Sequence, residues 1–161
     1  MRTGIEAAVV AALEGLGADF EAFDIDPDFA DTAAFCARYG FTLEESANAI
    51  LVASKQPPGV HSLCLALATN RLDVNHAVRD LMGVRKLSFA PADVTRDVTG
   101  MEIGGVTPFG IPAGVAIYVD AAVTRLSRCI VGGGSRSMKV KLDPEVFRRM
   151  PEVQVVEGLA G

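Results

Sequence analysis

The segment Gly104–Pro112 (GGVTPFGIP) has the composition of a rigid loop whose backbone amides can bind an oxygen atom. Glycine permits backbone conformations closed to other residues and lets a ligand approach the main chain, while proline stiffens the loop. Exposed amides in such a loop suit a carbonyl or phosphate oxygen. A plain structural turn explains the composition equally well. The pattern therefore predicts an oxyanion- or phosphate-binding loop, with a turn as the alternative.

A second glycine-rich segment, residues 132–137 (GGGSRS), also resembles a phosphate-binding loop. It lacks the G-x-x-x-x-G-K-[ST] spacing of a P-loop, which disfavours nucleotide hydrolysis. A tight hairpin that uses glycine for positive φ has equal weight. We expect Arg136 to be the side chain of this segment that contacts a phosphate.

The cysteines and histidines do not form a recognisable reactive group. Three widely spaced cysteines in apolar surroundings are typical of reduced, buried thiols, and neither they nor the two histidines show metal-ligand spacing. His61 or His76 could act as a general base, but no partner carboxylate is evident in the sequence, so ordinary surface or half-buried histidines are favoured. No Ser-His-Asp or Cys-His arrangement is present. We expect neither a metal nor another cofactor.

The charge is unevenly distributed along the 161 residues, whose net charge is −5. Residues 125–149 hold seven basic side chains against two acidic ones, which could form a phosphate-binding patch or merely a solvated face. The N-terminal apolar segment is interrupted by Glu6 and Glu14, and no apolar run reaches the ~18 residues of a membrane span. The sequence predicts a cytoplasmic protein without a membrane partner.

The elements that must position these loops are mixed in order. Apolar periodicity, capping residues and turn residues predict helices and strands without a sustained βαβ alternation, which indicates an α+β fold. The length predicts a single domain over residues 1–161. The expected helices cover 3–16, 31–39, 74–82, 92–99 and 144–150, and the expected strands cover 20–25, 48–54, 61–69, 86–89, 115–120, 128–131, 140–142 and 154–156.

GGVTPFGIP resembles the Gly-(Gly)-x-Ser/Thr-Pro-x-Gly loop of the YbaK/EbsC family, the editing domains related to bacterial prolyl-tRNA synthetase. Upstream, GVRKLSFAPADVTRDVTG is similar to the family's lysine-bearing strand, helix and glycine. Downstream, IVGGGSRSMKVKL resembles its strand, glycine-rich turn and strand. The resemblance covers residues 31–157 and implies an α+β domain with a mixed, partly barrel-like sheet flanked by helices. It also implies hydrolysis of the ester that joins a wrong amino acid to tRNA.

The resemblance implies a set of site residues, with one departure from the family. Family editors carry a substrate-contacting lysine at the start of the strand after the second helix, where this chain has Asn48. Lys86 matches another lysine of relatives, and Lys139 stands where some relatives have an acidic residue. The cation of the site is thus expected to have moved from the strand at 48–54 to that at 137–142. The catalytic candidates are Gly104, Gly105, Lys86 and Asn48, and the substrate-binding candidates are Thr107, Pro108, Phe109, Gly110, Gly133, Gly134, Ser135, Arg136 and Lys139.

The function that follows from the resemblance is trans-editing deacylation of tRNA carrying a small or medium amino acid. The expected partner is the acceptor end of aminoacyl-tRNA, with an aminoacyl-tRNA synthetase as a further candidate. A catalytically silent binding module that lost hydrolysis with the family lysine is the second hypothesis. A hydrolase of another small acyl or amino-acid ester is the third. If the 125–149 cluster borders the pocket, tRNA is favoured; if it does not, the small-molecule hypotheses gain.

Overall fold

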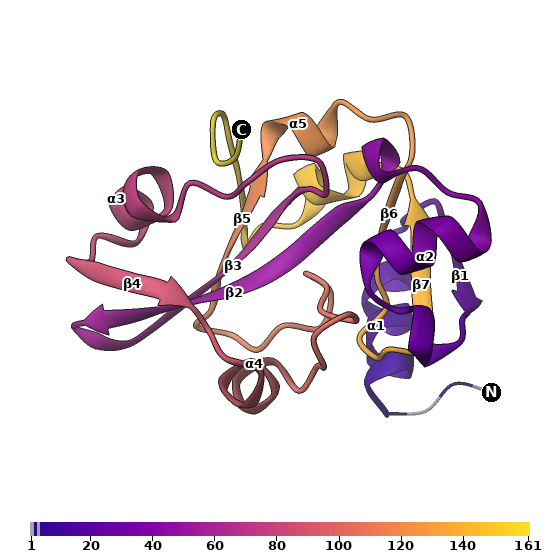
Figure 1. The fold of residues 1–161 in the computed structure, drawn as a ribbon, viewed down its shortest axis with the longest axis horizontal. Coiled ribbons are helices and arrows are strands. Elements are labelled where there is room, and N and C mark those ends of the chain that lie inside the picture. Colours follow the sequence, from indigo (N-terminus) through magenta and orange to yellow (C-terminus); the bar gives the residue numbers. More distant parts are fainter. Residues whose placement is uncertain (1, 3) are drawn as a thin grey trace.

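The computed structural model describes residue 2 and residues 4–161, in which the strands form two sheets (Figure 1). The five-stranded sheet has the order β4 (Lys86–Phe89), β2 (Ala47–Gln56), β3 (Pro58–Leu67), β5 (Ala116–Asp120) and β8 (Val153–Val156). Its β4-β2-β3 part is antiparallel, whereas β5 runs parallel to β3 and to β8. The three-stranded sheet is antiparallel, in the order β1 (Phe20–Asp24), β7 (Met138–Leu142) and β6 (Cys129–Gly132).

The two sheets meet where β2 begins. A parallel bridge joins Ser46, immediately before β2, to Ile130 of β6, and the sheets are not closed into a barrel. The main core lies between them, so apolar residues of both sheets exclude water together. It includes Leu51, Leu63, Leu65 and Val119 from one sheet, Val131, Val140 and Leu142 from the other, and Val9, Leu13 and Phe147 from outside the sheets. The predicted mixed α+β fold is confirmed.

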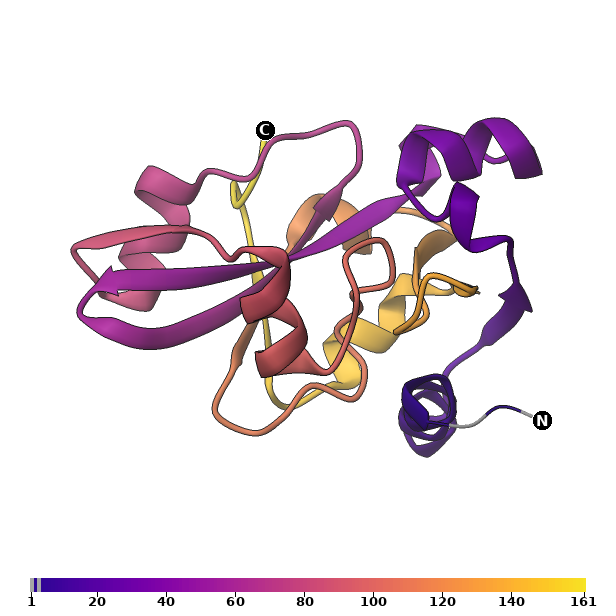
Figure 2. The same ribbon diagram turned by 60° about the horizontal axis from the view of Figure 1, so that its bottom comes forward.

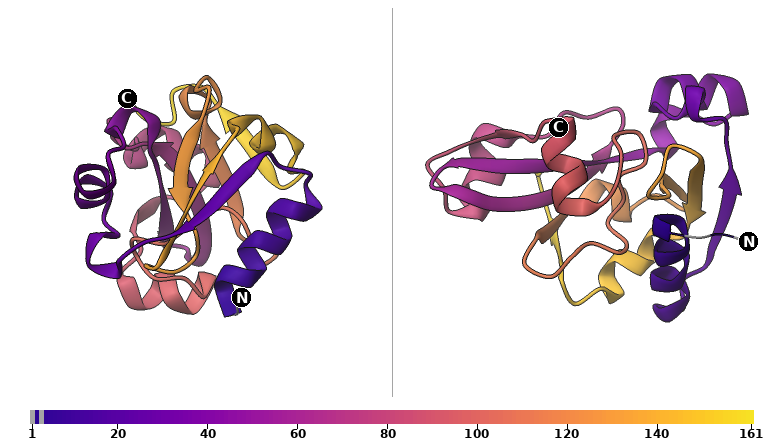
Figure 3. Two further views of the ribbon diagram at one scale, coloured as in Figure 1. Left: turned by 90° about the vertical axis from the view of Figure 1, so that its right-hand side faces the viewer. Right: turned by 90° about the horizontal axis from the view of Figure 1, so that it is seen from below.

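Two helices lie on opposite faces of the three-stranded sheet (Figure 3). Helix α1 (Gly4–Gly15) packs Val9 and Leu13 into the main core. Helix α2 (Thr32–Tyr39) packs on the other face, where Phe35 stacks on Phe23 and Phe41 with ring centroids 6.0 and 5.2 Å apart. Such offset aromatic contacts add to the apolar burial, and they fix the position of α2.

The remaining helices are short. Helices η3 (Val74–Val78) and α3 (Arg79–Met82) cover the face of the five-stranded sheet opposite the main core, where Val78 packs with Val52 and Tyr118. The others are η1 (Pro27–Phe29), η2 (Leu43–Glu45), α4 (Ala92–Thr99), α5 (Ala121–Thr124) and η4 (Pro144–Arg149). Within the described part of the chain, every helix is too short or too polar to cross a membrane.

The loop between α4 and β5 extends from the five-stranded sheet toward α1 and the three-stranded sheet, then returns to β5 (Figure 2). This path brings the GGVTPFGIP segment against the GGGSRS turn between β6 and β7. Gly134 donates a backbone hydrogen bond of 2.6 Å to the Gly105 carbonyl at this contact. The two glycine-rich segments of the sequence are therefore neighbours in space.

Most predicted elements are present, with differences at their ends. The 48–54/61–69 hairpin is confirmed but longer, since β2 and β3 are separated by Pro57 alone. The predicted cap at Asp143 is present, although its helix is of the 3-10 type. Asp31 precedes α2 without a side-chain capping bond because its carboxylate pairs with Arg136. Helices η1, η2 and α5 were not predicted, and Thr3, the predicted first residue of α1, lies outside the described residues.

Candidate functional site

A cavity of about 340 Å³ lies where α2, the start of β2, the β6–β7 pair and the loop before Val106 meet. Its walls are mostly apolar, with a few polar groups converging from different elements, as is typical of small-molecule sites. The lining residues are Asp31, Thr32, Phe35, Ser46, Ala47, Asn48, Ala49, Ile50, Ile103, Gly104, Val106, Ile130, Val131, Gly132 and Lys139. Three of the predicted site residues, Asn48, Gly104 and Lys139, are thus brought together.

Lys139 is the buried cation of this cavity. Only 6% of the residue is exposed, and its ammonium donates a 2.9 Å hydrogen bond to the Gly104 carbonyl. The ammonium also lies 5.4 Å from the centre of the Phe35 ring, within the range of a cation–π contact. Burial lowers the pKa of Lys139 to about 8; the Asp31 carboxylate opposes this shift, and the Arg136 guanidinium adds to it.

Asn48 takes the position at which the family resemblance places a lysine. Its Oδ1 accepts a 2.5 Å hydrogen bond from the Thr32 hydroxyl of α2. Because Oδ1 accepts this bond, Nδ2 is the donor left for a ligand, and no described residue accepts from it. Thr32 was not predicted, and the signal for it was its place in the first turn of a helix that precedes the site strand. Asn48 and Lys139 line the same cavity, and the move of the cation from β2 to β7 stays a prediction.

Gly104 supplies backbone groups to the cavity. Its φ of +98° lies in the region that favours glycine. Its carbonyl is fixed by Lys139, while no described residue accepts a hydrogen bond from its amide. An unpaired backbone donor on a residue whose carbonyl binds a buried ammonium is an arrangement that can stabilise negative charge on an oxygen atom.

The other glycines of the two loops serve close packing. A Cβ on Gly105 would lie 2.2 Å from the Ser135 carbonyl oxygen, and one on Gly133 would lie 2.7 Å from the Met138 carbonyl oxygen. The Gly105 amide donates to the Glu102 carbonyl, and the Gly134 amide donates to Gly105. The structure does not place Gly105, Gly133 or Gly134 on the cavity wall. Here the structural alternative, tight turns, describes what is observed.

Residues 107–110 also lie away from the cavity. Thr107, Pro108 and Phe109 are buried, and the Phe109 ring stacks on Phe147 in the core with centroids 5.7 Å apart. Gly110 is exposed beyond them. Phe109 anchors the loop because an aromatic ring buries a large apolar surface. The residues of the loop that line the cavity are therefore Ile103, Gly104 and Val106, and the predicted contacts of residues 107–110 with substrate find no support in the geometry.

Arg136 stands behind the cavity rim as a structural link. Its guanidinium donates to the Asp31 carboxylate at 3.1 Å and to the Ile103 and Pro27 carbonyls at 2.9 and 3.0 Å. It thereby connects α2, the loop of Gly104 and η1. Ser135 donates to Glu6 of α1 instead of facing the cavity. The predicted phosphate contact of Arg136 competes with three acceptors that already hold its guanidinium.

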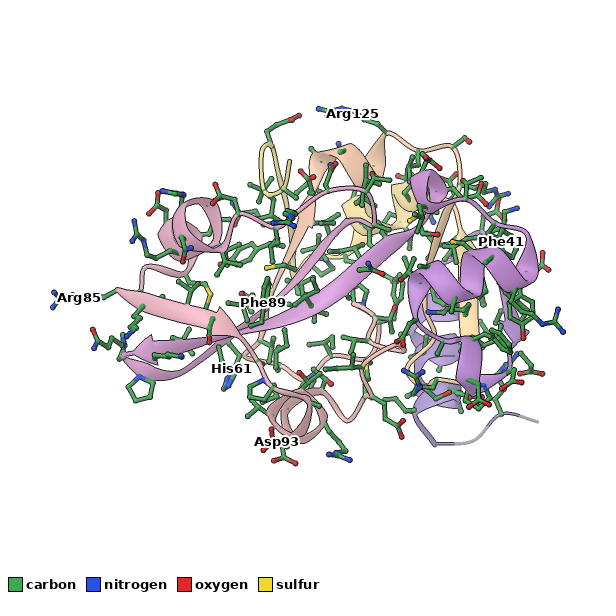
Figure 4. The ribbon with its side chains drawn as sticks, viewed as in Figure 1. Phe41, His61, Arg85, Phe89, Asp93 and Arg125 are labelled. Atoms are coloured by element: carbon green, nitrogen blue, oxygen red, sulfur yellow. The ribbon has the colours of Figure 1, made fainter. Side chains whose placement is uncertain are left out.

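Lys86 lies far from the cavity. It pairs with Gln56 near the tip of the hairpin, six residues or about 20 Å of strand beyond Ile50. Figure 4 labels Arg85, the residue before it, at the opposite end of the molecule from Phe41, which packs beside α2. The prediction that Lys86 shares a cleft with Asn48 is wrong, because the strand register places the two at different ends of β2.

Most basic residues of the 125–149 cluster lie outside the cavity wall. Arg125 pairs with Glu157, and Arg128 pairs with Asp19. Figure 4 shows Arg125 at the α5 edge of the molecule. Arg149 pairs with Glu145 and also donates to the Leu16 and Gly17 carbonyls, just after α1. Lys139 is the member that lines the cavity, and Arg136 contacts the wall residues Asp31 and Ile103, so the other five basic residues of the cluster do not border it.

Metal-binding groups were not expected, and the described residues hold no set of three or more His, Cys, Asp or Glu side chains able to bind a metal. All three cysteines are buried and free, and burial raises the pKa of Cys64 and of Cys129 to about 12. His76 has a carboxylate partner, Asp73, at 3.1 Å, which sequence reasoning missed. This pair lies outside the cavity walls.

Comparison with known families decides what kind of domain this is. The model of the aminoacyl-tRNA editing domain matches residues 26–150, a range that contains every residue of the cavity wall. The chain belongs to the aminoacyl-tRNA editing domain family. The YbaK-type resemblance expected from the sequence is thereby confirmed.

Solved structures share the fold of this editing domain at low sequence identity. The hypothetical protein APE2540 aligns with a TM-score of 0.83 and 20% identity over 96% of this chain and 99% of its own. A candidate trans-editing enzyme for prolyl tRNA synthetase aligns with a TM-score of 0.80 and 20% identity over 98% of both chains. At 20% identity, the structural similarity establishes the fold alone.

A curated relative matches in part. The uncharacterized protein YwhH of Bacillus subtilis (strain 168) is 31% identical over 83 residues, which are 52% of this chain and 52% of that protein. The aligned part of the editing domain thus spans about half the length of this relative.

Close packing of the two glycine-rich segments predicts that Gly105→Ala strongly destabilises the folded protein. The added methyl group would overlap the Ser135 carbonyl, so we expect the free energy of unfolding to fall by roughly 2–3 kcal/mol or more. Gly15→Ala is the matched control, since its Cβ meets open space at the end of α1. Urea unfolding of the three proteins measures the difference. Equal stability of Gly105→Ala and wild type would contradict the packing argument.

The buried ammonium predicts a pH-dependent stability. The pKa of Lys139 is about 8 in the folded protein and near 10.5 when unfolded, so the unfolded chain binds more protons between these values and stability rises with pH there. Between pH 7 and pH 10, the free energy of unfolding of wild type should therefore rise by roughly 2–3 kcal/mol relative to that of Lys139→Met. Urea midpoints across this range measure it. Cys64 and Cys129 lower the stability of both proteins at high pH, because their pKa values are raised in the folded state. Comparison of the two proteins cancels this contribution. A constant difference would contradict the burial of a charged Lys139.

Proposed function

We propose that this protein hydrolyses the ester bond of tRNA mischarged with a small or medium amino acid. The observation that carries the proposal is the meeting of three groups at one cavity of an editing-family domain: the Lys139 ammonium, the Asn48 amide and the Gly104 backbone. Each comes from a different element, so the fold positions them before substrate arrives. Pre-positioned donors stabilise developing charge without reorganisation.

The reaction needs only modest assistance because an aminoacyl ester is already activated. A water molecule attacks the ester carbonyl carbon, and negative charge develops on the carbonyl oxygen. The Gly104 amide and the Asn48 Nδ2 are the candidate donors to that oxygen. The bond to the ribose oxygen then breaks, that oxygen takes a proton that derives from the water, and the free amino acid leaves. Removal of one such donor typically costs about 10²-fold or more in rate.

Lys139 supplies the charge that the family position on β2 lacks. A pKa of about 8 leaves most of the ammonium protonated at pH 7. Attraction between a buried cation and an anionic group is several-fold stronger than in water because the surroundings are less polarisable. We assign Lys139 to hold the developing oxyanion or the phosphate of the terminal nucleotide, and to fix the Gly104 carbonyl at the same time.

The apolar walls provide the selection of the amino acid. Phe35, Ile50 and Ile130 narrow the cavity, and its volume of about 340 Å³ admits a small or medium side chain. A pocket of this kind selects by exclusion, although one methylene group discriminates by only ~10–200-fold. The partner we propose is the acceptor end of aminoacyl-tRNA, with a synthetase as a further partner for channelling the mischarged product.

A second function is favoured by one observation. Among the cavity residues, Asp31 is the one carboxylate, and its pairing with Arg136 occupies it. A site without a free general base suits a binding module that retains aminoacyl ends without turnover. The cavity wall lacks most of the basic cluster, which gives some weight to a hydrolase of small amino-acid esters that makes no contact with the tRNA body.

Lys139→Met should abolish or strongly reduce deacylation. We expect a loss of about 10²-fold or more in kcat/KM on the best substrate of a mischarged-tRNA panel, because the only cation that lines the cavity among the described residues is removed. Lys141→Met is the matched control, since Lys141 lies on the same strand and contacts Phe41 outside the cavity.

Wild-type activity should also decline above about pH 8 as Lys139 loses its proton, once the rate of spontaneous ester hydrolysis has been subtracted.

The outcomes separate the hypotheses. Full activity of Lys139→Met would contradict the role of Lys139. Binding of aminoacyl-tRNA by the wild type without turnover on any substrate would favour the binding module. Hydrolysis of amino-acid esters on small alcohols together with no preference for tRNA would favour the third hypothesis.

A charge exchange across the cavity should restore lost activity. Lys139→Glu alone places a carboxylate against the Gly104 carbonyl and should inactivate the protein. Addition of Asn48→Lys returns a cation to the cavity, which Asn48 and Lys139 both line, and we expect recovery of at least tenfold in kcat/KM over the single variant. The measurement is steady-state deacylation of the same tRNA by both variants. Equal activity of the single and double variants would show that position 48 does not compensate.

A further inference from the structure

A second groove adjoins the cavity on the same face of β2. Its volume is about 510 Å³, and Ile50 lines both it and the cavity. Asn48 and Ile50 are two residues apart on one strand, so their side chains point to the same face about 7 Å from each other. The other residues of the groove are Asn70, Arg71, Leu72, Asp73, Val74, Asn75, His76 and Phe89.

Phe89 gives the groove an exposed aromatic platform. It ends β4, and 54% of the residue is exposed, the largest fraction among the exposed large apolar residues of the described chain. Figure 4 shows it at the inner end of β4, toward the middle of the molecule. Among the described residues, no other aromatic ring or cation stacks on it. An unpaired ring of this kind suits the stacking of a nucleobase.

Polar groups face Phe89 from the segment 70–76. Arg71 is exposed, and its backbone is held by a pair of hydrogen bonds with Gly161 at 2.9 and 3.0 Å. A guanidinium on a fixed backbone is suited to bind phosphate. His76 is held by Asp73 at 3.1 Å, and Asn75 beside it is exposed, so both can hydrogen-bond base edges.

We propose that this groove binds the unpaired nucleotides that precede the terminal adenosine of the tRNA acceptor end. The inference rests on the proposed function, since an ester held beside Asn48 fixes where the strand leaves the cavity. The cavity and the groove share Ile50, so a single strand that leaves the cavity over Ile50 meets Phe89 and the 70–76 segment next. Proteins that bind single-stranded nucleic acid combine aromatic platforms with basic side chains, as Phe89 and Arg71 do here.

Binding of the RNA tetranucleotide ACCA, measured by fluorescence anisotropy, tests the groove directly. Phe89→Ala should weaken binding by about tenfold through loss of stacking, whereas Phe89→Trp should retain it. Arg71→Ala should weaken binding and reduce its salt dependence. Val60→Ala is the control, because Val60 is also an exposed apolar residue but lies near the hairpin tip, outside the groove. Retention by Phe89→Trp shows that an aromatic ring suffices at this position, and a urea unfolding midpoint of Phe89→Ala equal to that of wild type excludes misfolding as the cause of its loss.

A parallel measurement separates this inference from the proposed function. Wild type is assayed for hydrolysis of an aminoacyl ester of adenosine, which cannot reach the groove, and of the full aminoacyl-tRNA. Absence of both reactions together with Phe89-dependent RNA binding would refute the deacylase and support the groove. Hydrolysis of either ester together with RNA binding that is absent, or unchanged in Phe89→Ala and Arg71→Ala, would overturn the groove alone.

Discussion

The site depends on the close approach of two glycine-rich backbones. The Gly134 amide donates to the Gly105 carbonyl, and side chains at Gly105 or Gly132 would collide with the opposite main chain. This contact fixes a loop that has no regular secondary structure against the turn that begins β7. Because Lys139 follows that turn, its ammonium reaches the Gly104 carbonyl. Strand pairing positions Lys139, but without the contact the loop would have no defined position and the ammonium would lack its Gly104 acceptor.

The burial of Lys139 is a cost that packing alone would not favour. An amino group moved out of water loses hydration, and the lowered pKa expresses that loss. One hydrogen bond to Gly104, one aromatic face and the more distant Asp31 carboxylate compensate for part of it. An aliphatic residue in this position would avoid the cost. A charged group retained in an unfavourable place, at the wall of a cavity, is the pattern expected where charge serves a ligand.

The sequence predicted the class of fold and the region of the site, because both are encoded locally. Hydrophobic periodicity and turn residues give the helices and strands, and the order of motifs matches the editing family over most of the chain. The choice of side chains within the site was less accurate. Lys86 was included because a motif contains it, but strand register, a long-range property, places it at the far end of the hairpin. Arg136 was expected to meet phosphate, and tertiary contacts with Asp31 and two carbonyls occupy it instead.

What sequence reasoning could not separate was packing from binding within one loop. Glycine and proline are required both where a backbone contacts a ligand and where it contacts another backbone, so composition is the same in the two cases. In this protein two neighbouring glycines differ in their surroundings. Gly104 lines the cavity and packs against the Arg136 guanidinium, and no described residue accepts from its amide, whereas the Gly105 amide is bonded within the loop and a Cβ there would meet the Ser135 backbone. The difference between the two glycines is set by the turn that packs against them, some thirty residues later in the chain. The sequence of the loop alone therefore does not predict it.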